Sequence, residues 1–141
     1  MAGDKLLQVE NLTKYFYKPQ GLFGEKKQTV KSVDHISFDI MRNETLGLVG
    51  ESGCGKTTVG RTITRLYEPT DGRIIFDGQD ISHLTKKELL PYRKKMQMIF
   101  QDPYASLNAR MTVMDIIREA LDLHSDLKTK EEKSRRVYEL L

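Results

Sequence analysis

The chain of 141 residues carries 23 lysines and arginines against 20 aspartates and glutamates, which leaves a formal net charge of +3. Hydrophobic residues make up 38% and charged residues 30%, a mixture that excludes a disordered chain and allows one domain core of modest size. No window approaches the ~20 apolar residues that a membrane-spanning helix needs. The single cysteine, Cys54, cannot form an internal disulfide, which fits a reducing cytoplasm.

Two β-strands are predicted in the first forty residues. Residues 6–12 alternate loosely between apolar and polar side chains, and residues 35–40 alternate cleanly. The clean alternation indicates a half-buried strand with antiparallel pairing. One proline and two glycines lie between the two segments, and this composition predicts a loop around Gly21.

Two short and nearly continuous apolar runs, residues 45–49 and 96–100, predict strands that are covered on both faces, as in a parallel sheet. Apolar residues recur at helical spacing from Val59 to Leu66, so a helix is predicted after the first run. Residues 73–77 predict a further strand, which ends in a tight turn at Asp77-Gly78.

Three more helices are predicted from their start signals. Thr85 with a glutamate three residues later resembles a capping box, and Pro91 is expected to interrupt or kink the short helix that follows. Thr112 precedes an amphipathic helix, and Thr129, again with a glutamate three residues later, opens another. The last helical pattern continues to Leu141 without a C-cap signal, so the sequence is expected to be an incomplete domain.

One segment matches a phosphate-binding motif, the P-loop, at every fixed position. The motif G-x-x-x-x-G-K-[ST] is fulfilled by Gly50-Glu51-Ser52-Gly53-Cys54-Gly55-Lys56-Thr57. The segment follows a predicted strand and opens a predicted helix, which is the context that the motif requires. Glycines let the backbone approach a ligand closely, so that its N–H groups surround phosphate oxygens at the positive end of the helix. The sequence therefore predicts a nucleotide-binding site.

Four side chains at this motif have separate expected roles. Lys56 reaches the β- and γ-phosphates as a compact cation. Thr57 offers its hydroxyl to Mg²⁺, which takes few protein ligands, and Thr58 is placed to contact the α-phosphate. Cys54 is interpreted as a small filler of the loop, because no partner base for a nucleophile is visible.

The segments that flank the motif resemble the nucleotide-binding subunits of ABC transporters. Residues 39–45 and 67–81 carry this resemblance, together with residues 98–108, which look like the Q-loop region of that family. The sequence of these segments is most similar to that of the oligopeptide and dipeptide importer ATPases, and the resemblance covers essentially residues 6–141. It implies an α/β fold with ATP and Mg²⁺ as cofactors.

The resemblance also implies how the chain is divided. Residues 1–103 would form the N-terminal portion of an ABC ATPase domain, with an antiparallel β subdomain and the P-loop NTPase core. Residues 104–141 would begin a helical subdomain that contacts the transmembrane partner. The early pair Leu22-Phe23 is interpreted either as a partner contact or as a packed loop tip.

Two further site residues follow from the same resemblance. Gln101 would contact Mg²⁺ and the attacking water, and it lies just beyond a predicted strand end, where ligands bind in open α/β sheets. An aromatic ring after the first strand would stack on adenine. Phe16 fits that position best, with Tyr15 and Tyr17 as alternatives and with simple packing as the competing interpretation.

The expected function is that of the ATP-binding subunit of an importer, with peptides as the favoured cargo. Its implied partners are transmembrane permease subunits and a second ATP-binding subunit, at the cytoplasmic face of the cell membrane. No L-S-G-G-Q signature, Asp-Glu strand end or switch histidine follows Gln101. We therefore expect ATP or ADP binding with little or no hydrolysis by these residues alone.

Two other classes of function stay open from the sequence. One is a different P-loop NTPase, such as a small-molecule kinase, and the other is a non-catalytic nucleotide-binding module. Basic clusters at Lys86-Lys87 and at residues 93–95 are interpreted as solvated helix faces, so no nucleic-acid partner is expected.

Overall fold

The structure is a computed structural model that describes residues 4–17, 29–102 and 107–141. Contacts within the chain divide it into two compact units, Met1–Met98 and Ile99–Leu141. The domain division expected after residue 103 stays a prediction. The loop predicted around Gly21, with the Leu22-Phe23 pair, lies outside the described residues.

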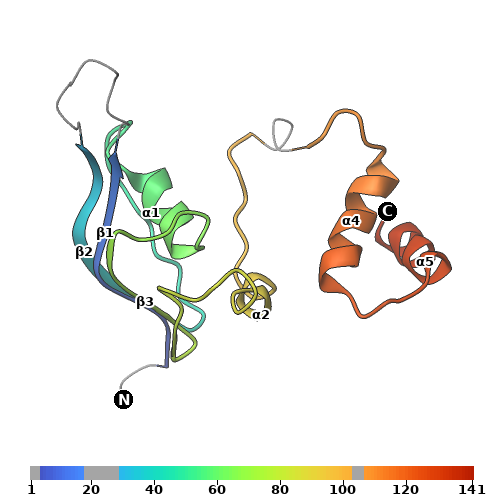
Figure 1. The fold of residues 1–141 in the computed structure, drawn as a ribbon, viewed down its shortest axis with the longest axis horizontal. Helices are drawn as coiled ribbons and strands as arrows, with labels where there is room; N and C mark the ends of the chain where they lie inside the picture. The colour runs from blue at the N-terminus through green and yellow to red at the C-terminus, as the bar shows by residue number, and fades with distance from the viewer. Residues whose placement is uncertain (1–3, 18–28, 103–106) are drawn as a thin grey trace. The chain divides into compact units, whose positions relative to one another are not determined.

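A four-stranded sheet of order β2-β1-β3-β4 forms the first unit (Figure 1). Its strands are β1 (Lys5–Tyr17), β2 (Thr29–Met41), β3 (Asp71–Phe76) and β4 (Gln79–Asp80). All three pairings are antiparallel, which confirms the pairing predicted from the alternation of residues 35–40. Both long strands extend past the predicted segments, because the backbone ladder continues where the apolar alternation fades.

Strand β1 changes phase at Asn11. Leu7 and Val9 are buried before this residue, and Leu12 is buried after it, so the inward positions shift by one. Asn11 has a φ of 49°, and the pairing with both neighbouring strands is irregular between Val9 and Thr13. This β-bulge explains why residues 6–12 alternate only loosely in sequence.

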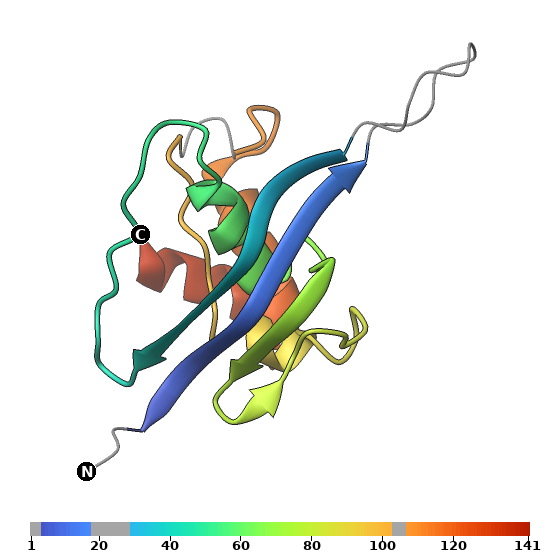
Figure 2. The ribbon, with the colours of Figure 1, turned by 90° about the vertical axis from the view of Figure 1, so that its left-hand side faces the viewer.

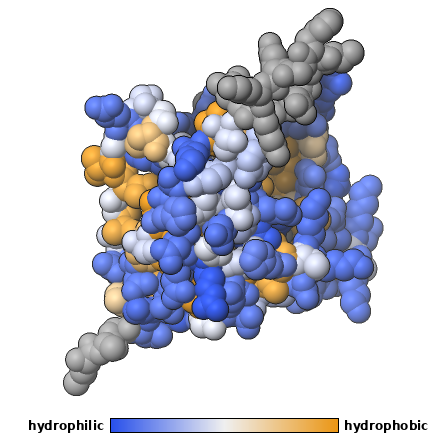
Figure 3. Space-filling model, turned by 60° about the vertical axis from the view of Figure 1, so that its left-hand side comes forward, coloured by the Kyte–Doolittle hydropathy of each residue, from blue (hydrophilic) through white to orange (hydrophobic). Residues whose placement is uncertain are grey.

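Helix α1 (Lys56–Ile63) covers one face of the sheet (Figure 2). Its Val59 joins a core in which Leu12, Ile74 and Ile81 are completely buried. Hydrophilic side chains dominate the opposite face of the sheet, which Figure 3 presents. The sheet is therefore one-sided, as its alternating strands predict.

The two apolar runs at residues 45–49 and 96–100 are not strands, and the prediction of two buried parallel strands is wrong for this structure. Val49 is 95% exposed and Ile99 is 94% exposed. A buried strand needs hydrogen-bonded neighbours and cover on both faces. Within the described part of the chain, no strand pairs with either run.

Local signals between the sheet and α2 have mixed outcomes. Asp77 and Gly78 have φ values of 53° and 79°, which is the pattern of a type I′ turn and confirms the predicted turn. Thr85 and Glu88 exchange hydrogen bonds as a capping box does, but turns follow them. The short helix α2 spans Leu90–Arg93 and has Pro91 in its first turn, where a proline is tolerated, so the predicted interruption is wrong.

Two helices, α4 (Val113–His124) and α5 (Lys130–Leu140), make up most of the second unit. The Thr112 side chain accepts a hydrogen bond from the Asp115 N–H, and Thr129 forms a complete capping box with Glu132. Both predicted helix starts are confirmed. Among the residues that the structure describes, every helix is too short or too polar to span a lipid bilayer.

Candidate phosphate-binding site

The segment from Gly50 to Gly55 forms an irregular loop that leads directly into α1. Gly55 is the N-cap residue, with a φ of 103°, and no side chain caps the first turn. The first N–H groups of a helix have no partner within the helix, and the helix dipole makes this end positive. The loop and the start of α1 therefore present backbone donors suited to an anion.

Glycine is required at position 55 by the neighbouring strand. A Cβ at this position would lie 2.2 Å from the Ser32 carbonyl oxygen of β2, and only glycine adopts its φ without strain. A Cβ at Gly50 would lie 2.7 Å from Cys54 Sγ on the other side of the loop. The loop is thus closed on itself and pressed against β2 at Ser32.

Lys56 folds back over the loop. Its Nζ donates hydrogen bonds to the carbonyl oxygens of Gly50 and Glu51, each at 2.6 Å, and lies 3.5 Å from Cys54 Sγ. The ammonium group therefore lies within the curve of the loop, where two carbonyl dipoles compensate its charge. A phosphate group is a stronger acceptor for the same donor, because its oxygens carry formal charge.

The remaining motif residues lie around this lysine. Thr57 and Thr58 belong to the first turn of α1, with the Thr57 side chain exposed and Thr58 half-buried. Glu51, Ser52 and Gly53 are exposed at the outer bend of the loop. The structure therefore brings all nine residues from 50 to 58 together, as their continuity in sequence requires.

Phe16 lies in β1, opposite Val30 of β2. Lys14 of β1 pairs with Val33, so the phosphate loop approaches the sheet at Ser32, close to the end of β1 that carries Phe16. Phe16 is 36% exposed as a residue, and its ring contacts the ring of Tyr67, which follows α1. The strand end, the loop and the segment after α1 thus converge on one region of the first unit.

Tyr15 has different surroundings. Its hydroxyl donates a hydrogen bond to Asp34, and Lys31 Nζ lies 5.0 Å from the centre of its ring. The hydrogen bond to Asp34 raises the pKa of Tyr15 above its usual value. Successive side chains of a strand point to opposite faces, so Tyr15 and Tyr17 are on the other face from Phe16. Of the three rings, only that of Phe16 lies on the face of the sheet that α1 covers.

Gln101 is exposed in an irregular segment of the second unit. Its contacts with Mg²⁺ and the attacking water stay a prediction. It does not follow a strand, because residues 96–100 are irregular.

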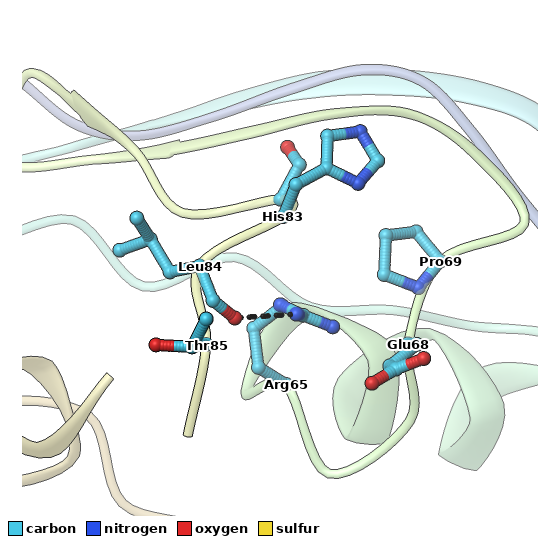
Figure 4. A pocket seen from close by; sticks show the side chains of 7 residues that line it. Arg65, Glu68, Pro69, His83, Leu84 and Thr85 are labelled. Carbon is cyan, nitrogen blue, oxygen red and sulfur yellow. Dashed lines mark hydrogen bonds between the residues drawn. The ribbon is translucent and has the colours of Figure 1, made fainter. Parts of the chain in front are cut away.

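A cavity of about 260 Å³ lies elsewhere in the first unit (Figure 4). None of the predicted nucleotide-binding residues lines it. Arg65 is buried at its wall and donates hydrogen bonds to the carbonyl oxygens of Ile81 and Leu84. Burial lowers the pKa of Arg65. The arginine thus fixes the end of α1 to the segment that follows β4.

Arg61 and Tyr67 also lie near the predicted site, although no sequence motif points to either of them. The hydroxyl of Tyr67 accepts a hydrogen bond of 2.9 Å from Arg61 Nη1, and its ring meets Phe16. Tyr67 is separated from Phe16 by 51 residues, so only the fold brings the rings together.

Comparison with known proteins gives consistent results. The sequence profile of the ABC transporter family matches residues 33–141. The oligopeptide transport ATP-binding protein OppF of Bacillus subtilis (strain 168) is 57% identical over 139 residues, which cover 98% of this chain and 43% of that protein. The dipeptide transport ATP-binding protein DppF of Lactococcus lactis subsp. cremoris (strain MG1363) is 49% identical over 139 residues, covering 97% and 43%.

Solved structures show the same fold. The ATP-binding cassette MJ0796, in a dimeric post-hydrolysis state bound to ADP and Pi, matches 94% of this chain and 54% of its own, with a TM-score of 0.72 and 22% identity. A nucleotide-free ATP-binding cassette from an ABC transporter matches 97% and 53%, with a TM-score of 0.65 and 24% identity. This chain spans less than half the length of the curated relatives named above. The chain belongs to the ABC transporter family.

Proposed function

We propose that this chain is the N-terminal part of the ATP-binding subunit of a peptide importer and that it binds ATP through its phosphate loop. The observation that carries the proposal is the loop from Gly50 to Gly55, which lies at an uncapped helix start and curves around the Lys56 ammonium. The donors and the cation of a polyphosphate site are thus in one place before any ligand arrives.

Binding of the triphosphate would exchange one set of acceptors for another. Lys56 would leave the carbonyl oxygens of Gly50 and Glu51 for the β- and γ-phosphates. The N–H groups between Gly53 and Thr58 would donate to the same phosphates, with the dipole of α1 behind them. A cradle that a Cβ at Gly50 or Gly55 would obstruct fits a ligand that approaches the backbone closely.

Thr57 and Gln101 are the residues that we assign to Mg²⁺. Within the described ranges, no cluster of three or more histidine, cysteine, aspartate or glutamate side chains could hold a metal ion. Magnesium that is bound with a nucleotide takes one or two protein oxygens, phosphate oxygens and water, so a threonine hydroxyl and one amide oxygen suffice as its protein ligands. The ion would neutralise charge that develops on the transferred phosphoryl group.

Phe16 is the ring that we assign to adenine. Its exposed position on the α1 face of β1, near the contact between Ser32 and the loop, supports this choice over Tyr15 and Tyr17. Stacking on a base contributes ~1–3 kcal/mol and tolerates different bases. We therefore expect weak discrimination between nucleotides at this position.

The proposed cargo and partners come from the relatives. OppF and DppF are named for oligopeptide and dipeptide transport, and their high identity supports a peptide importer. The whole protein would act at the cytoplasmic face of the membrane, bound to transmembrane permease subunits and paired with a second ATP-binding subunit. By themselves, the residues described here would bind ATP or ADP with little or no turnover.

Lys56→Ala tests the proposal. A hydrogen bond to a charged group contributes ~1.5–3 kcal/mol, so loss of the ammonium should weaken ATP binding by roughly tenfold to a hundredfold. Titration calorimetry with Mg-ATP measures the change. Lys87→Ala is the matched control, because Lys87 is an exposed lysine in a turn outside the loop. Unchanged ATP affinity in Lys56→Ala would refute the proposed site.

A further inference from the structure

Four side chains form a compact group beside the phosphate loop, and we call it the ring cluster: Lys14, Phe16, Arg61 and Tyr67. The rings of Phe16 and Tyr67 meet edge to face, with centres 5.4 Å apart and planes at 85°. Lys14 Nζ lies 5.0 Å from the centre of the Phe16 ring and 6.0 Å from that of Tyr67. Edge-to-face pairing and a nearby cation both favour a defined ring orientation.

Tyr67 is itself held in place by α1. Arg61 Nη1 donates a hydrogen bond to the Tyr67 hydroxyl, and the Arg61 guanidinium lies 5.7 Å from the centre of the Tyr67 ring. The Tyr67 N–H donates to the Arg61 carbonyl oxygen at 3.0 Å. Both the backbone and the side chain of Tyr67 are therefore fixed to the helix that begins at the phosphate loop.

The segment that carries Tyr67 is also fixed to the strand that carries Phe16. The Thr70 N–H donates to the Thr13 carbonyl oxygen at 2.8 Å, and the Tyr15 N–H donates to Thr70 Oγ1 at 2.9 Å. Both bonds meet β1 just before Phe16, at Thr13 and Tyr15. The backbone of β1 and the segment after α1 are thus joined within three residues of each ring, which limits the distance between the two rings.

We propose that Tyr67 is a positioning residue for the nucleobase: it holds the Phe16 ring in the orientation that stacks on the base, and Arg61 holds Tyr67. The inference rests on the proposed function, since it deepens the assignment of Phe16. Phe16 lies near a strand end and is 36% exposed. Without a neighbour its ring could rotate, and holding it in the stacking orientation would then cost conformational entropy when the nucleotide binds. Contact with Tyr67 removes that freedom before the nucleotide binds.

A purely structural role for Tyr67 makes a different prediction. In that case Tyr67 packs the segment after α1, and its loss would disturb the phosphate loop and the base site alike. A positioning role affects only ligands that carry a base. Inorganic tripolyphosphate has the phosphates of ATP without its base, so binding of the two ligands separates the two roles.

The test compares Tyr67→Ala and Tyr67→Phe with the unaltered full chain, by calorimetry with Mg-ATP and with magnesium tripolyphosphate. Tyr67→Ala should weaken ATP binding by about threefold to tenfold, the range of an aromatic pair, and leave tripolyphosphate binding unchanged. Tyr67→Phe keeps the ring and loses the bond to Arg61, so it should recover part of the ATP affinity. An unchanged ATP affinity in Tyr67→Ala, or an equal loss for both ligands, would overturn the inference.

Two further variants complete the design. Tyr92→Ala removes an edge-to-face pair of the same kind, with Phe76, at 6.5 Å and 81°, and should leave ATP affinity unchanged. Phe16→Ala should weaken ATP binding, and adding Tyr67→Ala to it should cause no further loss; a full additional loss would contradict positioning. Lys56→Ala separates the two proposals: if it keeps full ATP affinity, the nucleotide site itself fails, whereas failure of Tyr67→Ala alone leaves that site intact.

Discussion

Ile74 and Ile99 lie in two short apolar segments, yet Ile74 is completely buried and Ile99 is 94% exposed. Ile74 belongs to β3, which is hydrogen-bonded to β1 on one side and to β4 on the other. Ile99 belongs to the run at residues 96–100, which pairs with no strand in the described part of the chain. The comparison separates the tendency of a segment to be buried from the presence of a partner that buries it.

The same contrast holds for the run at residues 45–49. Strands β3 and β4 pair across the short turn at Asp77-Gly78, whereas neighbouring parallel strands need a crossover connection of a dozen or more residues. An apolar run therefore indicates a tendency to be buried, but burial also requires a partner strand or helix. In both runs the local sequence favours a buried strand and the structure shows an irregular segment.

The largest effect is expected at the buried member of the pair. Ile74→Ala removes a completely buried side chain at the centre of the sheet and should cost ~2–5 kcal/mol of the free energy of unfolding. Urea denaturation followed by circular dichroism measures the change. A cost below about 1 kcal/mol would show that β3 does not form the centre of the core.

A smaller effect is expected where β3 turns into β4. The Asp77 carboxylate accepts hydrogen bonds from Arg42 at 2.6 Å and from Lys95 at 3.1 Å. These bonds lower the pKa of Asp77 below the usual 3.8, and the bond from Arg42 has the larger effect. Because the pKa is lowered on folding, the ionised carboxylate stabilises the fold above the unfolded pKa of about 4. This stabilisation is lost as the pH falls toward the folded value.

Asp77→Asn isolates that contribution, because asparagine keeps the shape of the side chain and tolerates the left-handed backbone of the turn. The variant should be less stable than the unaltered chain at pH 7, and the difference should shrink between about pH 5 and pH 3. Denaturation midpoints at several pH values measure the difference. A difference that stays constant down to pH 3 would exclude the two ion pairs as its cause.

The smallest effect is expected at the exposed member of the pair. Ile99→Ala makes the same chemical change as Ile74→Ala and should alter the free energy of unfolding by no more than about 0.5 kcal/mol, as is usual for exposed positions. The two variants are matched controls for each other in one denaturation series. If Ile99→Ala costs as much as Ile74→Ala, then residues 96–100 are buried against a partner in solution.

Local chemistry explains what could be predicted from the sequence. The turn at Asp77-Gly78 and the capping box at Thr129 depend on residues within three positions of each other, and both were predicted correctly. The bulge at Asn11 could not be predicted, because its inward shift is set by pairing with β2 and β3. The ends of β1 and β2 differ from the predicted ones for the same reason, because pairing between strands continues beyond the apolar alternation.

The candidate site divides in the same way. The phosphate loop is continuous in sequence, so its motif identifies every residue from 50 to 58 without knowledge of the fold. Phe16 had two competing neighbours, and only the face of the strand distinguishes the three rings. Tyr67 and Arg61 escaped notice because their contact with Phe16 depends on the return of the chain from α1 to β1. The role assigned to Gln101 stays a prediction.

The hydrogen bonds of Lys56 have one further consequence. The carbonyl oxygens of Gly50 and Glu51 accept from the Lys56 ammonium group, which is the role that phosphate oxygens would take, and the ammonium holds both carbonyl groups on one side of the loop. The unliganded loop is therefore preorganised, and the affinity for a nucleotide measures the difference between two sets of bonds. Without Lys56 the loop would lose its hydrogen bonds to the Gly50 and Glu51 carbonyl oxygens as well as a contact to phosphate. The conformation of the loop should therefore change even in the absence of ATP.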